Sequence, residues 1–267
     1  MKKNSPQAHG IPVKKQYGQH FLRNQAVIDT MINAVTLAPQ SSVFEIGCGD
    51  GFLTKSIQQT PMARLWVFEI DPDWARYVQE HYPDKRMAIW QENILDVDFT
   101  RFKEHAPWVL LANLPYQITF PILHLLQQHR HFLQEGVVMV QEEVAQKIVK
   151  QSGRGYGYVS LFFQYYFTWR LLTKIPPADF YPPPAVDSRL LHFTPRDVQP
   201  IPDEEKFWAF IKHCFAQPRR TLRNNLLATP YAAYAKQTDF QYGDLRAQQM
   251  SMEDFLALWQ IIRPRSA

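Results

Sequence analysis

The segment Ser41–Gly51 constrains the fold more than any other part of the chain. It begins with a short apolar strand over 43–46 and runs into a turn rich in glycine. The three glycines of this turn occupy alternate positions: Gly47, Gly49 and Gly51. A helical pattern follows, and then a second apolar strand over 65–71 that ends in acidic residues. A strand, a glycine turn, a helix and another strand form a βαβ unit, so we expect an α/β fold with a Rossmann-like sheet.

The polar residues around this unit favour a nucleoside ligand. Glycines let the backbone approach a ligand closely, and Glu69 follows them by about twenty residues, where a carboxylate accepts the hydroxyls of a ribose. The turn lacks the Gly-Lys-Ser/Thr of a P-loop and differs in spacing from the dinucleotide fingerprint. Glu45 is placed to receive a ligand's ammonium group or to orient the loop. S-adenosylmethionine carries an ammonium and no pyrophosphate, so it suits this acidic turn better than NAD; the alternative is a turn with incidental glycines.

A second motif, Asn113-Leu114-Pro115-Tyr116, follows an apolar run over 109–112 that predicts a buried strand. Asn113 offers an amide oxygen and an amide NH₂, Pro115 stiffens the turn, and Tyr116 offers a flat face for stacking. This combination suits a planar base that carries an amino group. The alternative is an ordinary strand-ending turn, because Asn and Pro are common there for conformational reasons alone.

Further strands complete the predicted sheet. A strand over 87–90 runs into polar residues that include Asn93, at the strand end where ligands bind in such sheets. Asn93 is a candidate for reading an adenine edge through its amide, or alternatively a capping residue. We expect a fifth strand over 136–140 and late strands, antiparallel to the rest, over 161–169 and 189–193.

The segment 175–188 carries too many prolines to lie inside a sheet or a helix. We therefore expect a rigid connecting loop. Phe180 in this loop is a candidate for a second stacking plate beside Tyr116. The alternative is that Phe180 anchors the loop to the core.

The chain is expected to have three parts. We predict a disordered arm over 1–13, a catalytic domain over 14–197, and a small all-α domain over 198–267, where the pattern becomes purely helical. Six basic residues are candidates for contacts with RNA phosphates, or alternatively belong to a solvated surface. They are Lys147, Lys150, Arg154, Arg219, Arg220 and Arg223.

Composition limits the class of protein. The formal net charge of +4 permits an anionic partner without requiring one. The two cysteines, Cys48 and Cys214, lie far apart, which argues against a disulfide framework and favours a reducing compartment. No apolar run of about 18 residues is present and the first residues do not form a signal peptide, so we expect a cytoplasmic protein without membrane contact. No metal site is expected.

Taken together, five segments closely resemble the ribosomal RNA adenine N6-dimethyltransferase family, and specifically its small-subunit (KsgA) branch. The resemblance runs from about Lys14 to Ile262, nearly the whole chain. The segments that carry it are Tyr17–Leu22, Glu45–Thr54, Asn113–Tyr116, Phe180–Ser188 and Arg219–Leu226. Leu114 matches the small-subunit branch better than the sister branch of erythromycin-resistance methyltransferases, which acts on 23S rRNA and typically has Ile there.

The resemblance implies a class I S-adenosylmethionine-dependent methyltransferase domain with a helical C-terminal domain. It implies transfer of four methyl groups to two adjacent adenosines near the 3′ end of 16S rRNA, within the small ribosomal subunit or its precursor, by a monomer. The residues expected to bind the cofactor or line its site are Gln19, His20, Leu22, Glu45, Gly47, Gly49, Glu69, Asn93 and Asn113. Two of them depart from the usual pattern, because His20 stands where Asn is frequent and Asn93 where Asp is usual.

The expected mechanism is direct transfer of a methyl group to the N6 amine of a flipped adenosine. Asn113 Oδ1 and the Leu114 carbonyl accept the hydrogens of the amine, Pro115 fixes the turn, and Tyr116 with Phe180 stacks on the base. Three other hypotheses stay open at this point: a non-catalytic assembly factor for the small subunit, an NAD-dependent dehydrogenase, and a 23S rRNA adenine dimethyltransferase.

Overall fold

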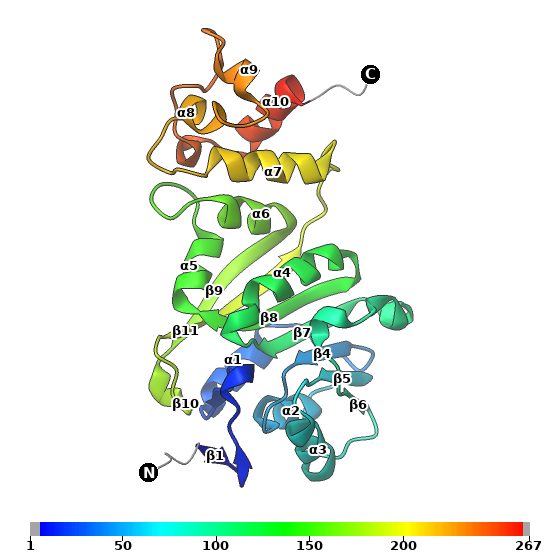
Figure 1. Ribbon diagram of the computed structural model, residues 1–267. Coiled ribbons are helices and arrows are strands. Elements are labelled where there is room, and N and C mark those ends of the chain that lie inside the picture. The colour runs from blue at the N-terminus through cyan, green and yellow to red at the C-terminus, as the bar shows by residue number, and fades with distance from the viewer. Residues whose placement is uncertain (1–5, 264–267) are drawn as a thin grey trace. The chain divides into compact units, whose positions relative to one another are not determined.

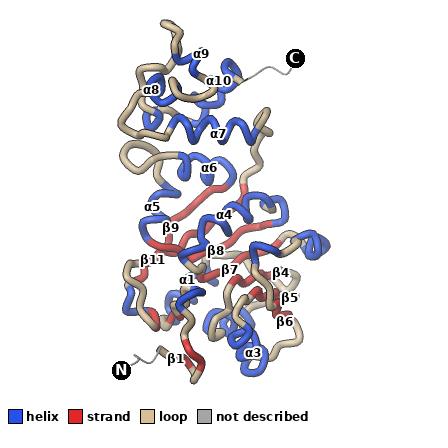
Figure 2. The backbone as a smooth tube through the Cα atoms, viewed as in Figure 1, coloured by secondary structure: helices blue, strands red, loops and turns tan. Residues whose placement is uncertain are grey.

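The computed structural model describes residues 6–263 and divides into two compact units. The first unit holds the described residues up to Ala145 together with Thr168–Pro195. The second holds Gln146–Phe167 and the described residues from Arg196 onward, and it consists almost entirely of helices and loops (Figure 2). The expected boundary at 198 is close to the observed one, but the segment 146–167 was expected in the catalytic domain.

The first unit is built on a seven-stranded sheet with the strand order β6-β5-β4-β7-β8-β11-β9 (Figure 1). The pairs β4–β5, β4–β7, β5–β6 and β7–β8 are parallel, whereas β11 runs antiparallel to β8. The strands are β4 (Ser42–Ile46), β5 (Arg64–Phe68), β6 (Met87–Trp90), β7 (Trp108–Asn113), β8 (Leu133–Gln141), β9 (Phe167–Ile175) and β11 (Ser188–Pro195). The expected α/β fold is therefore confirmed.

Strand order reverses at β4, because β5 and β6 lie on one side of it and β7 and β8 on the other. Such a switch point opens a crevice beyond the carboxyl ends of the strands, where ligands bind. Gly47 follows β4 and Asn113 ends β7, and Ile46 pairs with Ala112 in the register of these two strands. The topology therefore brings the two sequence motifs to the same edge of the sheet.

Helices cover both faces of this sheet. On one face, Val43, Val67 and Leu111 pack in a common apolar cluster with residues of α1, α2 and α3. On the other face, the Phe44 ring contacts Trp108 at 4.5 Å between ring centroids, and α4 buries apolar side chains. The helices of the first unit are α1 (Gln25–Asn33), α2 (Phe52–Gln58), α3 (Pro72–His81) and α4 (Thr119–Gln128), while α5 (Glu142–Val149) crosses the division between the units.

The helix starts follow local sequence signals. Asn24 Oδ1 accepts a hydrogen bond from Ala26 N at the start of α1, as an N-cap asparagine does. Pro72 occupies the first turn of α3, where proline is favoured. Both helices therefore begin where their sequences say they should.

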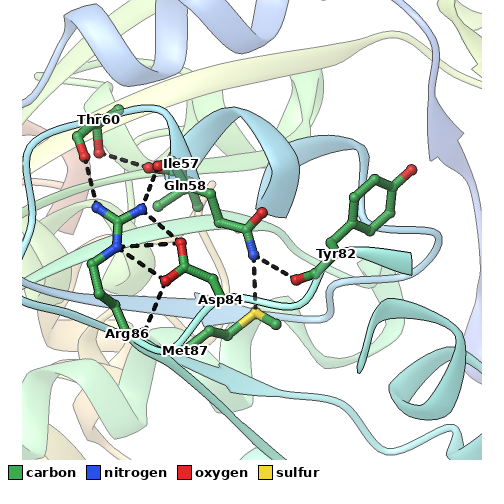
Figure 3. A network of polar contacts seen from close by, with 7 residues as sticks. All are labelled: Ile57, Gln58, Thr60, Tyr82, Asp84, Arg86 and Met87. Carbon is green, nitrogen blue, oxygen red and sulfur yellow. Dashed lines mark hydrogen bonds and ion pairs between the residues drawn. The ribbon is translucent and has the colours of Figure 1, made fainter. Parts of the chain in front are cut away.

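An arginine ties α2 to the strand that leads to Asn93. Arg86 donates hydrogen bonds from Nη2 to Gln58 O (2.6 Å) and from Nη1 to Thr60 O (3.3 Å), at the carboxyl end of α2 (Figure 3). Asp84 holds the same guanidinium through Oδ1 (3.1 Å) and Oδ2 (2.6 Å). The cation meets unpaired carbonyls at a helix end, where positive charge is favourable. These contacts of Arg86 with Gln58, Thr60 and Asp84, here called the clamp, fix the start of β6.

The N-terminal segment differs from its prediction. Residues 1–5 of the predicted disordered arm lie outside the described residues, but residues 6–13 are ordered, so the prediction is wrong for them. They form a hairpin of β1 (Gln7–Ala8) and β2 (Ile11–Pro12). Ala8 and Val13 are buried in a small cluster with Phe21 and Trp74, so tertiary contact supplies the order that the local sequence lacks.

The predicted strand over 161–169 is also wrong. The structure has helix α6 (Tyr158–Tyr166) there, and the strand β9 begins only at Phe167. Within the second unit, the Phe162 ring lies 4.8 Å from Trp208 of α7 (Glu204–Cys214). Aromatic residues favour strands by propensity, but here they line the buried side of a helix.

The rest of the second unit is helical, as predicted. Its remaining helices are α8 (Leu222–Leu226), α9 (Ala232–Ala235) and α10 (Met252–Ile262). Ser251 and Asp254 form a capping box at the start of α10. In the first unit, a short strand β3 (Phe21–Leu22) pairs with β10 (Phe180–Tyr181), which interrupts the proline-rich loop. No helix within residues 6–263 is long and apolar enough to span a membrane.

Candidate active site

A pocket of about 1020 Å³, including space open to solvent, lies beyond the carboxyl ends of β4, β5, β6 and β7. Its walls come from the glycine turn, the Asn113 motif and the segment Tyr17–Leu22. Among its described lining residues there is no Lys or Arg, whereas three are acidic: Asp50, Glu69 and Glu92. The pocket therefore favours a cationic ligand and disfavours a pyrophosphate.

The glycine turn is shaped for close approach by a ligand. Gly47 and Gly49 have φ angles of 75° and 51°, which side-chain-bearing residues rarely adopt. A Cβ on Gly47 would have only Asn113 O nearby, at 4.0 Å, so this part of the turn faces open space in the pocket. The backbone here is exposed to the ligand because no side chain covers it.

Glu69 forms the acidic wall beside this turn. Its Oε2 accepts a hydrogen bond from Gly49 N (3.0 Å) and its Oε1 accepts one from Asp71 N (2.8 Å). Burial raises the pKa of this carboxyl. Oε2 also accepts from Cys48 Sγ (3.7 Å), so Oε1 is the oxygen that keeps acceptor capacity, because a carboxylate has about four lone-pair sites. Glu69 can thus hold the turn and still accept a hydroxyl of a ribose.

Glu45 does not line the pocket, so the structure contradicts direct contact with a ligand's ammonium group and leaves the alternative that it orients the loop. Its side chain lies fully buried on the face of β4 that is covered by α2, flanked in the sheet by Val67 and Leu111. Its carboxylate oxygens make no hydrogen bond of standard geometry within residues 6–263, and the Thr54 side chain of α2 is the polar group that interacts with them. Burial raises the pKa of Glu45 to about 8. In this structure it supports the strand beneath the turn and does not touch the ligand space.

Asn113 is held in one orientation. Its Nδ2 donates a hydrogen bond to the backbone oxygen of His20 (3.1 Å), which can only accept. Its Oδ1 has no partner among the described residues, so the amide oxygen is the group left for a ligand. Leu114 N donates to Met139 O, which fixes the next peptide at the end of β7. Pro115 O accepts from Ile118 N and closes the following turn.

Tyr116 is fixed at both its hydroxyl and its ring. The hydroxyl lies 2.5 Å from Ser188 Oγ, and burial raises its pKa. The ring stacks on His20 with 5.9 Å between centroids and 23° between planes. His20 Nδ1 lies 2.7 Å from Pro182 O, so this nitrogen carries the proton. His20 therefore joins the Asn113 motif to the proline-rich loop.

Phe180 is placed as an anchor and not as a stacking plate. Its side chain is buried in the main apolar cluster, it does not line the pocket, and it pairs with Leu22 between β10 and β3. Leu22, in contrast, is buried and also lines the pocket, as predicted. The stacking role predicted for Phe180 is therefore wrong in this conformation, because alternation along β10 turns its ring into the core.

Gln19 and Asn93 both line the pocket but have different surroundings. Gln19 Nε2 donates to Asp71 Oδ2 (2.8 Å) and its Oε1 accepts from Lys14 N (2.8 Å), so both ends of its amide are occupied. Asn93 Oδ1 accepts from Leu95 N (3.2 Å), as a capping residue does. The alternative that Asn93 is a capping residue is therefore correct, and the same side chain also faces the pocket.

Sequence reasoning missed residues that the structure brings to the site. Asp50 lines the pocket and forms an ion pair with Arg23 (2.6 Å). Ser188, which holds Tyr116, is fully buried. Asp50 lies in the segment Glu45–Thr54 and Ser188 in the segment Phe180–Ser188, both of which carry the family resemblance. Their place in these segments is the sequence signal that pointed to them. Within residues 6–263, no group of three or more His, Cys, Asp or Glu side chains is arranged to hold a metal.

The predicted RNA contacts fall into two groups. The exposed ones are Lys147, Lys150, Arg154, Arg219 and Arg220. Arg223 differs, because its NH1 donates to Ala235 O and Gln237 O, both at 2.6 Å. Its guanidinium closes a loop of the second unit, so its predicted role as an RNA contact is not supported.

The comparisons with known proteins agree with this site. The family model described as ribosomal RNA adenine dimethylase matches residues 11–263. The chain belongs to the ribosomal RNA adenine dimethylase family. A "Ribosomal RNA small subunit methyltransferase A" of Syntrophotalea carbinolica is 35% identical over 260 residues, which cover 94% of this chain and 97% of the relative. A protein of the same name from Chlorobium phaeobacteroides is 32% identical, covering 95% and 93%.

Solved structures show the fold of the dimethylase family in this chain. A dimethyladenosine transferase from Plasmodium falciparum superposes with a TM-score of 0.76 at 21% identity, covering 90% of this chain and 96% of that one. The 23S rRNA methyltransferase ErmE gives 0.68 at 21% identity, covering 91% and 100%. The protein is an rRNA adenine dimethyltransferase of the class I fold, and its cofactor is S-adenosylmethionine.

The pocket fits this cofactor of the dimethylase family. The open cradle at Gly47 admits a ligand against the backbone, and Glu69 offers an acceptor for a ribose hydroxyl. The absence of Lys and Arg from the described lining suits a ligand with an ammonium and a sulfonium. The same lining argues against NAD, because it offers no Lys or Arg to a pyrophosphate among its described residues.

Proposed function

We propose that this enzyme dimethylates N6 of two adjacent adenosines near the 3′ end of 16S rRNA, in the small ribosomal subunit or its precursor. The observation that carries the proposal is the match to small-subunit methyltransferases over more than nine-tenths of both chains. Leu114, at the position where the 23S branch typically has Ile, supports the same substrate. We further propose that the protein acts as a monomer in the cytoplasm, where ribosomal precursors are its substrate.

Positioning of the amine is the main catalytic contribution of the chain. The lone pair of an adenine N6 is delocalised into the ring, so the amine is a poor nucleophile. The unpaired Oδ1 of Asn113 and the Leu114 carbonyl accept its two hydrogens and hold the nitrogen in a pyramidal, reactive geometry. His20 supports this step, because its backbone oxygen takes the Asn113 NH₂ and leaves the amide oxygen as the acceptor.

Tyr116 holds the flipped base. Its ring is fixed by Ser188 at the hydroxyl and by His20 on one side. A fixed aromatic plate loses little entropy when a base stacks on it. When bound, S-adenosylmethionine would supply a methyl group activated by a sulfonium for transfer to this nitrogen. The alkylated amine is strongly acidic and releases its proton to water, so the mechanism calls on no dedicated base.

The substrate is tested by locating dimethyladenosine on both rRNAs. Primer extension stops at N6,N6-dimethyladenosine, and it is applied to 16S and 23S rRNA from cells with and without the gene. We expect stops at two adjacent positions near the 3′ end of 16S rRNA that depend on the gene. Gene-dependent stops on 23S rRNA alone would show the other substrate, and no gene-dependent stop on either rRNA would favour a non-catalytic assembly factor.

The mechanism is tested with Asn113→Ala. This variant loses the acceptor for the amine, and we expect turnover on small-subunit particles to fall by at least about a thousandfold, while S-adenosylhomocysteine still binds within about threefold of wild type in calorimetry. Asn113→Asp keeps an acceptor but cannot donate to His20 O, so intermediate activity is expected. Near-normal turnover of Asn113→Ala would rule out the mechanism.

A further inference from the structure

The side-chain amide of Asn93 also contacts a neighbouring carboxylate, Asp96. Its Nδ2 donates a hydrogen bond to Asp96 Oδ2 at 2.8 Å. On the other side of the same amide, Oδ1 accepts from Leu95 N. A carboxylate only accepts and a peptide N–H only donates, so the two contacts specify the same orientation of the amide. The oxygen and nitrogen of Asn93 are therefore assigned by their surroundings.

Asp96 is committed to this contact. It forms no ion pair within residues 6–263, and its backbone N donates to Asn93 O (2.9 Å), which ties the two residues a second time. The nearby Glu92 is different, because Arg101 neutralises it at 3.0 Å. Asp96 is thus the exposed carboxylate without an ion-pair partner next to the Asn93 amide, and its hydrogen bond holds the NH₂ side of that amide.

We propose that Asp96 is a positioning residue, which locks the Asn93 amide so that its oxygen faces the exocyclic amine of the cofactor's adenine. This inference rests on the proposed function, because it takes the ligand beside Asn93 to be adenine. An amide in this orientation accepts from the adenine amine and can donate its second N–H to a ring nitrogen, the bidentate pattern by which Asn reads adenine. A carboxylate at position 93 could only accept, so Asn93 with Asp96 offers more base discrimination than an aspartate there.

The test compares two ligands that differ at the amine. S-adenosylhomocysteine carries the adenine amine, whereas its deaminated analogue S-inosylhomocysteine carries a carbonyl oxygen there. Wild type should bind the adenosine form at least about tenfold more tightly, because the Asn93 oxygen meets a donor in one and an acceptor in the other. Dissociation constants of both ligands are measured by calorimetry on the full-length protein.

Asp96→Ala removes one of the two contacts that orient the amide and leaves only the bond from Leu95 N (3.2 Å), so the NH₂ turns more easily toward a carbonyl. We expect this variant to bind S-adenosylhomocysteine more weakly by about fivefold and S-inosylhomocysteine no more weakly than wild type, so that discrimination falls about fivefold or more. Asp96→Asn keeps an acceptor for Nδ2 and should retain most of the discrimination. An equal loss for both ligands, or no change for either, would overturn the proposal.

Asp98→Ala is the matched control. It removes a carboxylate from the same loop, but this one accepts from Thr100 N (3.0 Å) and does not contact Asn93. We expect the ratio of the two affinities to stay at the wild-type value in this variant. Lost discrimination in Asp98→Ala would mean that any charge in the loop has the effect, and would overturn the specific role of Asp96.

In the Asn93→Asp variant, we expect removal of Asp96 to change the affinity for S-adenosylhomocysteine in the opposite direction. In Asn93→Asp, position 93 no longer has an NH₂ to donate, and two carboxylates face each other. Removing Asp96 should then strengthen binding of S-adenosylhomocysteine, whereas it weakens binding in the wild-type background. If removal of Asp96 changed the affinity in the same direction in wild type and in Asn93→Asp, the positioning role of Asp96 would be contradicted. If wild type fails to bind S-adenosylhomocysteine at all, the proposed function fails first, and that result is distinct from a failure of the lock.

Discussion

A single buried carboxyl shows what position does to a side chain. Glu45 has an ordinary pKa of 4.5, and burial raises it to about 8. In the folded protein the group therefore keeps its proton over a pH range where the unfolded chain has lost it. Proton binding by the folded state stabilises at low pH and this stabilisation disappears as pH rises, so the sign is opposite to that of an ion-paired carboxylate.

We expect Glu45 to make the protein less stable as pH increases from 4.5 to about 8, with no further effect above that. The slope is about 1.4 kcal/mol per pH unit. Glu45→Gln should remove it, so the loss of unfolding free energy between pH 5.5 and pH 8 should be smaller in the variant by about 3 kcal/mol. Urea unfolding at a series of pH values measures this difference.

The control for this titration is Glu80→Gln, at an exposed glutamate on α3. Its stability should follow the wild-type pH curve. Parallel curves for wild type and Glu45→Gln would show that Glu45 does not carry the raised pKa, and the dependence would have to be sought in another group.

At the scale of elements, the same residue types have different uses. The hydrogen bonds of Arg223 close a loop, whereas Arg219 and Arg220 are exposed, although all three stand in one basic stretch. Aromatic residues over 161–166 lie on a helix although their propensity favours a strand. In each case the neighbour supplied by the fold decides the outcome, and that neighbour is distant in sequence.

The clamp between α2 and β6 is the element contact that we expect to be most sensitive to one change. Arg86→Ala removes hydrogen bonds to the carbonyls of Gln58 and Thr60 and leaves Asp84 unpaired. Because the side chain is partly exposed, we expect a loss of about 1–2 kcal/mol of unfolding free energy. Chemical denaturation measures it, with exposed Lys85→Ala as the neighbouring control. A loss no larger than that of the control would contradict the role of the clamp.

At the scale of the whole molecule, the two units point to a division of labour. The pocket is formed entirely by the first unit, and the exposed basic residues under discussion belong to the second. We propose that the second unit binds RNA while the first carries out the chemistry. The segment 146–167 belongs to the second unit, so the first unit is made of two separate stretches of sequence. All residues that line the pocket lie in the first of these stretches.

Substitutions of the basic residues distinguish those that contact RNA from the one that stabilises a loop. Arg219→Glu with Arg220→Glu should weaken binding to small-subunit rRNA and reduce the slope of log affinity against log salt by about 2, one for each lost phosphate contact. Filter binding over a range of salt concentrations measures this slope. Arg223→Ala should instead lower the stability of the second unit. An unchanged slope in the double variant would remove these arginines from the interface.

Lys236→Glu is the control for charge itself, because this lysine is also exposed in the second unit but lies outside the basic stretch. We expect its salt slope to stay within the error of wild type. A slope reduced as much as in the double variant would mean that net charge alone, without a localised contact, governs binding.

The sequence by itself determined the features that depend on local pattern. The βαβ unit, the positions of Gly47, Glu69 and Asn113, and the starts of α1 and α3 follow from periodicity, glycine spacing and capping, which act between residues close in the chain. The five motifs also indicated the family, because they occur along the chain in the order that is typical of it.

Only the tertiary structure decided which atoms face the ligand. It buried Glu45 and Phe180 away from the pocket, ordered residues 6–13 against Trp74, and fixed the Asn113 amide by means of the His20 backbone. The physical reason is the same in each case. Burial and the orientation of an amide depend on partners that are far away in sequence, so no local pattern specifies them.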